Sequence, residues 1–323
     1  MLPLCLSMVL VANGGQSSIE VFDQQDWEAH HLTTLHVASS SPSSSLTFSH
    51  PLPMQTPWSV LPDQVEDPER GWHQSSCQPN DAVLGTYARE VSEYTYDVET
   101  LTKGYAYRWT RNGTLPQTLT FESRFTLRTS GRRLSRRFRF DPADKVPESL
   151  KKQCEEIAAK APASLIETAK GIAARSRDEV DVIRKFSNWI SQSIRYGTGR
   201  VGPYELSKIW ELKTGSCRRR STVFRAMCSV IGIPSREARG YIIKEGETKD
   251  ARNVGCHGWA EVYLRGAGWI EIEPATDGDA FEIPPSYVRN GYWENAWVES
   301  RGVTLNRVGQ DIMDDRLTWR RLR

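Results

Sequence analysis

The sequence predicts an α+β protein in which helices pack on an antiparallel sheet, preceded by a small all-β domain. Three patterns support this prediction. Aromatic and polar residues alternate over residues 86–141, and apolar residues follow helical spacing between residues 147 and 231. Two strand-like runs joined by a turn then occupy residues 257–273. Strands, helices and a hairpin in this order are typical of the α+β class.

The composition is that of an ordinary globular protein. The 323 residues are 38% hydrophobic and 25% charged, and the mean hydropathy is −0.53. No apolar run approaches the ~18 residues of a membrane-spanning helix, so a helical membrane protein is excluded. The length is typical of about two domains. Near-average charge and apolar content also exclude global disorder and collagen-like repetition.

The charges are distributed unevenly along the chain. Residues 1–100 carry 13 acidic residues and only Arg70 and Arg89 as basic ones, whereas residues 101–323 carry 40 basic and 27 acidic residues. Two opposed regions of this kind either pack against each other or leave the basic one for an acidic partner. Composition does not choose between the two.

The N-terminus and the cysteines bear on localisation and chemistry. Met1–Ala12 is apolar like the core of a secretory signal but lacks its positively charged start, so export to a periplasm and a cytoplasmic location both stay open. The cysteines have no zinc-site spacing, and we expect mostly free thiols, at least one of them used chemically. They are Cys5, Cys77, Cys154, Cys217, Cys228 and Cys256.

We expect four consecutive segments. Residues 1–84 are predicted to be a leader and a poorly structured Ser/Pro-rich arm, because Ser39–Ser45 is low-complexity and five prolines follow by residue 68. Residues 85–142 are the predicted all-β domain, and residues 143–285 the predicted catalytic core. Residues 286–323 are expected to be a C-terminal extension packing on that core.

The all-β segment has an arginine-rich face. Its buried positions are expected to be aromatic and aliphatic, among them Tyr105, Phe121 and Leu127. We expect the opposite face to be solvated rather than to bind phosphate, because the aromatic residues occupy the alternate positions that are predicted to be buried. The arginines of this face are Arg124, Arg128, Arg132, Arg133, Arg136, Arg137 and Arg139.

Helices are expected to follow. Pro147-Glu148 fits a helix start, and Pro162 interrupts the next stretch. Ser176-Arg177-Asp178-Glu179 is a capping-box pattern that predicts a further helix. One stripe of that helix is predicted to lie in the core: Val182, Ile183, Phe186, Trp189, Ile190 and Ile194.

The chemistry is expected at Cys217. It follows Gly215-Ser216 and precedes apolar residues at helical spacing that end at Gly232-Ile233-Pro234. Cys217 therefore lies at a helix N-terminus, where the positive end of the dipole favours a thiolate. Cys228 falls beside the apolar stripe of this helix and is expected in the core. Cys256 adjoins His257 but lies on a strand.

A thiolate nucleophile normally needs an imidazole beside it. Only His257 of the six histidines lies beyond residue 73. It begins one strand of the predicted hairpin and Glu273 ends the other, so both return to the same end of the sheet. An even-numbered register would also place them on the same face. A carboxylate there would fix the tautomer of the imidazole.

Five blocks in this order resemble the transglutaminase-like superfamily, whose core has the papain-type fold of cysteine enzymes. The resemblance covers residues 145–285, and the preceding all-β segment resembles the N-terminal domain often fused to this core. It implies that Cys217 is the nucleophile, His257 the general base and acid, and Glu273 the orienting carboxylate. The blocks are Gly215–Cys217, Gly232–Arg236, Gly240–Tyr241, His257–Tyr263 and Gly268–Pro274.

Two departures from the family pattern stand out. The family usually has Asp at the position of Glu273, and Glu271, which shares its strand parity, is the fallback. Arg218, Arg219 and Arg220 follow the nucleophile where acidic or small residues are more common. They would oppose the helix dipole but favour the thiolate. They either bias the site toward acidic substrates, or they reach into solvent or pair with the acidic N-terminal region.

The sequence therefore predicts cysteine-dependent acyl transfer or hydrolysis on protein or peptide amides through a thioester on Cys217. The first alternative is a catalytically inactive transglutaminase-like fold that acts as a binding module. The second is nucleic-acid binding by the arginine-rich face, which we regard as unlikely. No cofactor is expected, because no nucleotide, haem, flavin or EF-hand motif occurs, and no metal is required. The sequence does not indicate the oligomeric state.

Overall fold

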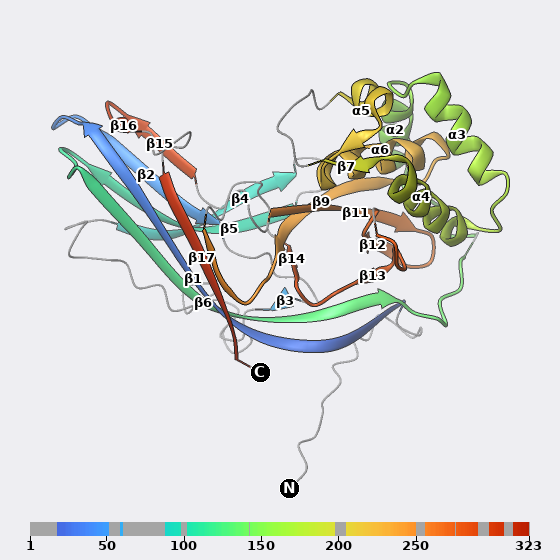
Figure 1. Ribbon diagram of the computed structural model, residues 1–323, viewed down its shortest axis with the longest axis horizontal. Coiled ribbons are helices and arrows are strands. Elements are labelled where there is room, and N and C mark those ends of the chain that lie inside the picture. The colour runs from blue at the N-terminus through green and yellow to red at the C-terminus, as the bar shows by residue number, and fades with distance from the viewer. Residues whose placement is uncertain are drawn as a thin grey trace, which may run out of the picture. The chain divides into compact units, whose positions relative to one another are not determined.

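The computed structural model describes residues 18–51, 59–60, 88–97, 102–141, 143–197, 205–249, 256–274, 276–289, 297–306 and 313–322. The architecture is mixed α+β, as the sequence predicts (Figure 1). Its described helices are α2 (Glu148–Ala158), α3 (Ala163–Ala173), α4 (Glu179–Ser193), α5 (Leu206–Leu212) and α6 (Cys217–Val230).

The described strands form four sheets. A seven-stranded sheet runs in the order β10-β17-β1-β6-β13, with β16 on β1 and β3 on β6. Two four-stranded sheets have the orders β12-β11-β9-β14 and β15-β2-β5-β4, and β7 pairs with β8. The strands before α2 are β1 (Ile19–Ser39), β2 (Ser45–Pro51), β3 (Ser59–Val60), β4 (Ala88–Asp97), β5 (Thr102–Asn112) and β6 (Thr118–Leu134). The strands between α4 and residue 272 are β7 (Arg195–Tyr196), β8 (Thr214–Gly215), β9 (Ser235–Ile242), β10 (Gly246–Lys249), β11 (Cys256–Leu264) and β12 (Gly268–Ile272). The later ones are β13 (Glu282–Ile283), β14 (Tyr287–Arg289), β15 (Trp297–Arg301), β16 (Thr304–Asn306) and β17 (Met313–Arg321).

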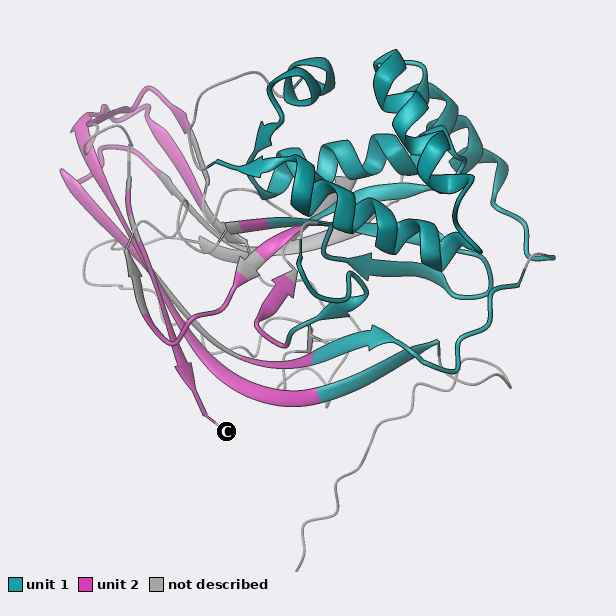
Figure 2. Cartoon of the chain, turned by 45° about the vertical axis from the view of Figure 1, so that its right-hand side comes forward, with its two compact units in different colours: residues 1–22, 131–238, 258–284 teal, residues 23–130, 239–257, 285–323 magenta. Residues whose placement is uncertain are grey.

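The chain divides into two compact units, coloured separately in Figure 2. Unit 1 comprises the described parts of residues 1–22, 131–238 and 258–284. Unit 2 comprises those of residues 23–130, 239–257 and 285–323. Both units are assembled from separate stretches and cut across the four consecutive segments expected from the sequence.

The core of unit 1 lies between helices and one hairpin. Alternate residues of β11 and β12, among them Val262, Leu264 and Ile270, are buried with apolar side chains of α3 to α6. The apolar stripe predicted for α4 is part of this core, and its Trp189 stacks on Trp210 with ring centroids 5.1 Å apart. The helix start at Pro147 is confirmed, and so is the interruption at Pro162, which is the N-cap of α3.

The predicted cap of α4 is wrong by two residues. Asp178 is the N-cap, because its side chain accepts a hydrogen bond from the backbone N–H of Asp181. Ser176 instead donates to the carbonyl of Ile172 in the preceding helix. Asp and Ser are comparably good N-caps, so the motif located the start of the helix without fixing which residue caps it.

The prediction of a poorly structured arm is wrong for the part of residues 1–84 that the structure describes. Residues Ile19–Ser39 form the 21-residue strand β1, and Ser45–Pro51 form β2. Every second residue of β1 from Trp27 to Val37 is buried. Two of these buried residues are His31 and Thr33, which interrupt the apolar alternation and hide the strand in the sequence. Residues 1–17, 52–58 and 61–84 of the predicted leader and arm lie outside the described residues.

Strands are confirmed in the predicted all-β segment, but they belong to two sheets. Strands β4 and β5 pair with each other, and β5 pairs with β2, whereas β6 belongs to the seven-stranded sheet. Phe121 of β6 stacks on Phe48 of β2 with centroids 3.9 Å apart, which joins the two sheets in the core of unit 2. The expected C-terminal extension likewise supplies β15, β16 and β17 to these sheets.

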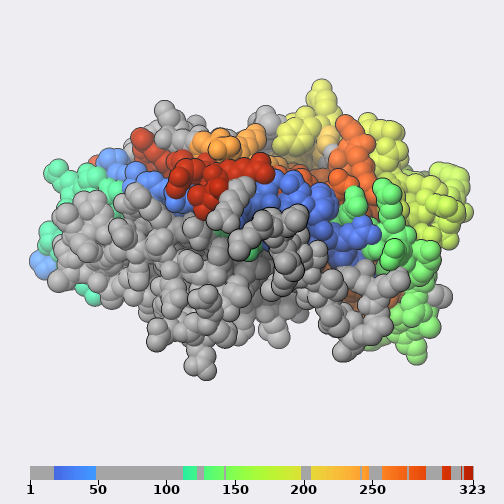
Figure 3. Space-filling view, turned by 90° about the horizontal axis from the view of Figure 1, so that it is seen from below, coloured from blue at the N-terminus to red at the C-terminus, as the bar shows by residue number. Residues whose placement is uncertain are grey.

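The two ends of the described chain meet in one sheet. Residues Trp27–Leu35 of β1 pair with Met313–Arg321 of β17 in an antiparallel register. In the space-filling view the blue residues of β1 and the red residues of β17 lie side by side (Figure 3). Strand β1 therefore relies on β17 for the backbone hydrogen bonds of Trp27–Leu35 along one edge, while its other edge pairs with β6.

Candidate active site

Cys217 is the first residue of α6, as the sequence predicts. Ser216 is the N-cap with extended backbone angles, and the Cys217 side chain is partly exposed. The helix ends at Val230, and the following Gly232 has a φ of +77° that reverses the chain before Pro234. The thiol thus lies where a helix dipole favours an anion.

The other described thiols lie in environments that suppress reactivity. Burial raises the pKa of Cys154, and it raises the pKa of the fully buried Cys228 well above its ordinary value. A thiolate is the reactive form of cysteine, so both are expected to be inert. Cys5, Cys77 and the side chain of Cys256 lie outside the described residues.

The hairpin has the even-numbered register that the sequence analysis requires. Glu261 pairs with Glu271, so the odd-numbered residues of both strands share one face. His257 is the second residue of β11, and Glu273 follows the end of β12. Both therefore have the parity of this face. The ring of His257 lies edge-on to Tyr287, with centroids 5.0 Å apart.

Hydrogen bonds connect α6 to the strand that carries His257. The hydroxyl of Ser221, one turn beyond Cys217, lies 3.1 Å from the carbonyl oxygen of Cys217. The same hydroxyl lies 3.3 Å from the carbonyl oxygen of Gly258, the residue after His257. The start of α6 and the start of β11 are therefore joined through one buried side chain.

Glu273 is buried and held through its backbone. Its N–H donates to the carbonyl of Ala280 at 2.9 Å, and its carbonyl accepts from the hydroxyl of Ser187 at 3.2 Å. Burial raises the pKa of Tyr196, and the charges of Cys217 and Glu273 raise it further. Both residues therefore act on the same tyrosine.

Glu271, the fallback, is engaged elsewhere. Its carboxylate binds the Arg132 Nε at 2.6 Å and the Trp259 Nε1 at 2.9 Å, with both members of the ion pair almost fully buried. The prediction that Arg132 lies on a solvated face is therefore wrong. An arginine on a strand can be buried when a carboxylate buried beside it pairs with its guanidinium, because neither charge is then left uncompensated.

Two more arginines of the predicted face find acidic partners. Arg128 pairs with Asp26 at 2.7 Å, and Arg133 pairs with Glu20 at 3.0 Å. Both carboxylates come from the acidic first hundred residues. Arg136, Arg137 and Arg139 are exposed, as predicted.

Two of the three arginines after Cys217 turn into the protein, so the expectation that they reach solvent is wrong for Arg219 and Arg220. Arg219 and Arg220 are buried, and Arg220 donates to the carbonyl of Ile194 at 2.6 Å. Arg218 pairs with Glu237 at 3.4 Å. The long aliphatic stems of these arginines allow such burial while the guanidinium groups keep polar partners.

Tyr196 is a candidate site residue that the sequence analysis missed. It lies on β7 opposite Gly215 of β8, and its side chain is 54% exposed. Partial burial raises its pKa first, and the nearby charges of Cys217 and Glu273 raise it further, while Arg220 opposes them. The sequence signal that could have identified Tyr196 is an aromatic residue two positions after Ile194, the last residue of the apolar stripe predicted for α4.

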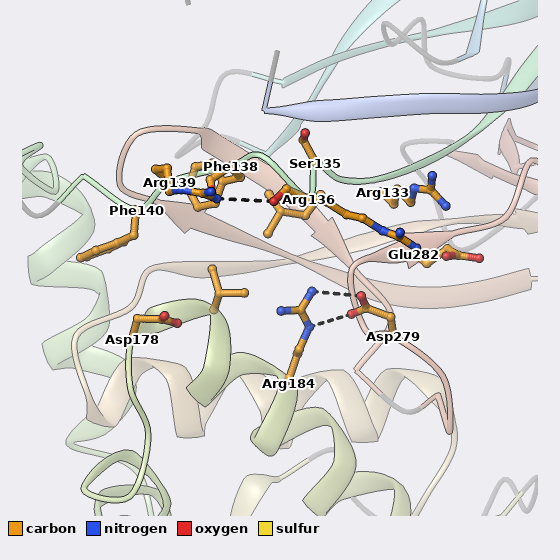
Figure 4. A pocket seen from close by; sticks show the side chains of 12 residues that line it. Arg133, Ser135, Arg136, Phe138, Arg139, Phe140, Asp178, Arg184, Asp279 and Glu282 are labelled. Atoms are coloured by element: carbon orange, nitrogen blue, oxygen red, sulfur yellow. Dashed lines mark hydrogen bonds and ion pairs between the residues drawn. The ribbon is translucent and has the colours of Figure 1, made fainter. Parts of the chain in front are cut away.

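A separate pocket of about 470 Å³ lies on unit 1, between the 133–140 segment and α4 (Figure 4). Arg133, Arg136, Arg139 and Arg184 line it together with Phe138 and Phe140. Cys217, His257 and Glu273 are not among its lining residues. Among the described residues, no three His, Cys, Asp or Glu side chains gather as a metal site. No described helix has the length and apolarity needed to cross a membrane.

Comparison with known proteins identifies the same stretch as the sequence motifs do. Residues 166–274 match the model of the transglutaminase-like superfamily. The uncharacterized protein YebA of Bacillus subtilis is 31% identical over 74 residues, which is 20% of this chain and 10% of YebA. This chain therefore corresponds to about a tenth of that relative.

Two solved structures are similar. A Cytophaga hutchinsonii protein provisionally assigned as a cysteine protease has a TM-score of 0.54 at 13% identity, over 94% of this chain and 100% of that one. The periplasmic domain of TgpA from Pseudomonas aeruginosa has a TM-score of 0.36 at 13% identity, over 75% and 92%, which is too low to support an argument. The first shows likeness of fold. Residues 166–274 of the chain thus match the transglutaminase-like superfamily.

Proposed function

We propose that the protein is a cysteine hydrolase or acyltransferase that acts on protein or peptide amides through a thioester on Cys217. One observation carries the proposal. Cys217 begins α6, and Ser221 ties that helix turn to the backbone immediately after His257. Glu273 would complete the triad. Besides burial, its charge and that of Cys217 both raise the pKa of Tyr196.

Thioester formation is the first chemical step. The Cys217 thiolate attacks the amide carbonyl carbon while His257 holds the thiol proton as an imidazolium. The C–N bond then breaks, and the imidazolium gives its proton to the departing amine. Glu273 stabilises the imidazolium and fixes the ring orientation. The N-terminal end of α6 stabilises the negative charge that develops on the carbonyl oxygen.

Resolution of the thioester determines the product. Water attacks the thioester carbon, His257 accepts its proton, and the C–S bond breaks to give a carboxylic acid and the restored thiol. A lysine amine in place of water would give a crosslink. We favour hydrolysis because no motif for an amine site occurs.

Electrostatics around Cys217 support a thiolate. Cys217 begins α6, where the positive end of the helix dipole favours an anion. Arg220 belongs to the same end of the helix, and its guanidinium lies 5.3 Å from the centroid of the Tyr196 ring. The thiolate fraction of Cys217 at neutral pH is therefore expected to exceed that of an ordinary cysteine.

Alkylation kinetics test the nucleophile. Iodoacetamide labelling, followed by peptide mass mapping, should modify Cys217 well below the ordinary thiol pKa of ~8.5 and faster than Cys154 or Cys228. His257→Ala should abolish this preference. Equal rates for all three thiols, indifferent to His257, would instead favour the catalytically inactive binding module.

Turnover tests the reaction. A glutamine-containing peptide incubated with hydroxylamine gives a hydroxamate if an amine resolves the thioester, and a glutamate or a shorter peptide if water does. Cys217→Ala should abolish all of these products, while Cys228→Ala serves as the matched control and should retain them. Product formation by the Cys217→Ala variant would exclude the proposed mechanism.

A further inference from the structure

Two buried serine hydroxyls outside the triad bind the two ends of the hairpin. Ser187 on α4 and Ser221 on α6 are 2% and 0% exposed. The Ser187 hydroxyl donates to the carbonyl of Glu273, and the Ser221 hydroxyl lies within hydrogen-bond distance of the carbonyl of Gly258. Each strand end that carries a proposed acid–base residue is therefore held by one serine.

Ser221 has two acceptors for a single proton. A serine inside a helix ordinarily donates to the carbonyl four residues earlier, which here belongs to Cys217. The carbonyl of Gly258 is a second, tertiary acceptor at a similar distance. The hydroxyl therefore lies between the main chain of the nucleophile and that of the residue beside His257.

Ser187 belongs to a row of polar residues on one face of α4. Arg184, Ser187 and Ser191 follow at spacings of three and four, which places them on the same side of the helix. Arg184 donates two hydrogen bonds of 3.0 Å to Asp279 (Figure 4), and Ser191 donates to Asp277. The whole segment that follows Glu273 is therefore attached to this helix.

Glu273 needs such attachment because it is one methylene longer than the aspartate usual in the family. Its N–H and its carbonyl are both bound, the first by Ala280 and the second by Ser187. With both backbone groups fixed, the position from which the carboxylate starts is defined. Because the glutamate side chain is one methylene longer, its carboxylate reaches the same point as that of an aspartate only if its main chain lies correspondingly farther away.

We propose, resting on the proposed function, that Ser187 and Ser221 are positioning residues for the proton transfer at Cys217. Ser187 fixes the origin of the Glu273 side chain, and Ser221 fixes the start of β11, and hence His257, relative to Cys217. Neither touches the reacting atoms.

The experiment measures the rate of Cys217 alkylation by iodoacetamide against pH in the full chain. The parent is compared with Ser187→Ala, Ser221→Ala and a control, Ser229→Ala, a buried serine at the other end of α6. Each positioning variant should move the apparent pKa of Cys217 toward ~8.5 and slow labelling at pH 6 by about tenfold. The control should keep the parent profile. Ser187→Thr and Ser221→Thr, which retain a hydroxyl, should keep it too.

The outcomes separate this proposal from the one on which it rests. A parent profile without a lowered pKa would overturn the proposed function itself. A lowered pKa in the parent that persists in both alanine variants would overturn the positioning role alone. Equal shifts in the alanine and threonine variants, or in the Ser229→Ala control, would also overturn it, since the hydroxyls would then not be responsible. Circular dichroism verifies that each variant is folded. If an alanine variant is not folded, the two threonine variants test the positioning role instead.

Discussion

Two glutamates two residues apart on one hairpin face have different environments. Glu271 is bound by Arg132 and Trp259, whereas Glu273 is held through its backbone near Tyr196. Strand parity alone makes them equivalent, and the sequence analysis accordingly kept both as candidates. The partners on β6 and β11 indicate that Glu271 has a structural role, which leaves Glu273 as the proposed orienting carboxylate.

Arg132→Met tests the structural role of Glu271. The substitution leaves a buried carboxylate without its cation, which should lower the free energy of unfolding by about 3–5 kcal/mol. Urea denaturation of the full chain measures this value. Arg128→Met, which breaks the more exposed pair with Asp26 on the same strand, is the matched control and should cost less than about 1 kcal/mol. Equal losses in the two variants would contradict this interpretation.

Lys213 is a second residue whose environment predicts a measurable effect. Its ammonium nitrogen lies 2.9 Å from the centroid of the Trp210 ring and 5.2 Å from that of Trp189. Burial lowers the pKa of this amine to about 8. The tryptophan rings oppose this effect, because their faces attract a cation.

The lowered pKa predicts a pH-dependent stability. Between pH 8 and the unfolded-state value of about 10.4, the unfolded chain binds more protons than the folded one. The free energy of unfolding should therefore rise with pH across this window. Urea denaturation at several pH values measures the slope, and Lys213→Met should remove it. A slope that is flat or negative in the parent would show that the rings, rather than burial, control this amine.

At the scale of elements, the turn before α6 sets the position of Cys217, the proposed nucleophile. Strand β8 ends at Gly215, two residues before Cys217, and pairs in parallel with β7. A β-carbon at Gly215 would lie 2.6 Å from the β-carbon of Arg219, a distance that real side chains essentially never show. Glycine is therefore required here for space, because the first turn of α6 folds back over it.

Gly215→Ala should displace the start of α6. We expect a loss of about 1–3 kcal/mol in the free energy of unfolding, together with slower alkylation of Cys217 below pH 7. Gly171→Ala on α3, where no atom lies within 4 Å of the added carbon, is the control. It should be neutral or stabilising, since alanine favours a helix over glycine. An unchanged alkylation rate in the Gly215→Ala variant would contradict this role.

The elements differ in how far local patterns predict them. The helix of Cys217 and the hairpin of His257 are confirmed because their stop signals, Gly232 and the turn at residues 265–267, are local. Strand β1 was missed because its buried His31 and Thr33 break the apolar pattern, and their strand partners, Leu317 and Asp315, are distant in sequence. Local pattern fails where burial depends on a distant partner.

At the scale of the molecule, the charge asymmetry is partly resolved by pairing within the chain. Asp26, Glu20 and Glu28 from the acidic region pair with Arg128, Arg133 and Arg320. Exposed pairs of this kind contribute little stability individually. They do show that the acidic and basic regions are interleaved in the described strands.

Truncation tests the dependence of β1 on β17. A chain ending at residue 312 lacks the strand that pairs with Trp27–Leu35 and buries Leu317 and Trp319. It should lose cooperative urea unfolding and aggregate, because an exposed strand edge is a template for association. A chain ending at Arg321, which removes only exposed or terminal residues, should behave like the parent. Cooperative, monomeric behaviour of the shorter chain would refute this dependence.

The sequence by itself determined the α+β class, the helix that begins at Cys217 and the hairpin that carries His257 and Glu273. These features follow from periodicity, turn residues and motifs within short windows, where the physical causes are local. Only the tertiary structure decided that Arg132 is buried against Glu271, that residues 19–39 form a central strand, and that Tyr196 lies beside Cys217. Each of these depends on a partner dozens to hundreds of residues away, which no local pattern specifies.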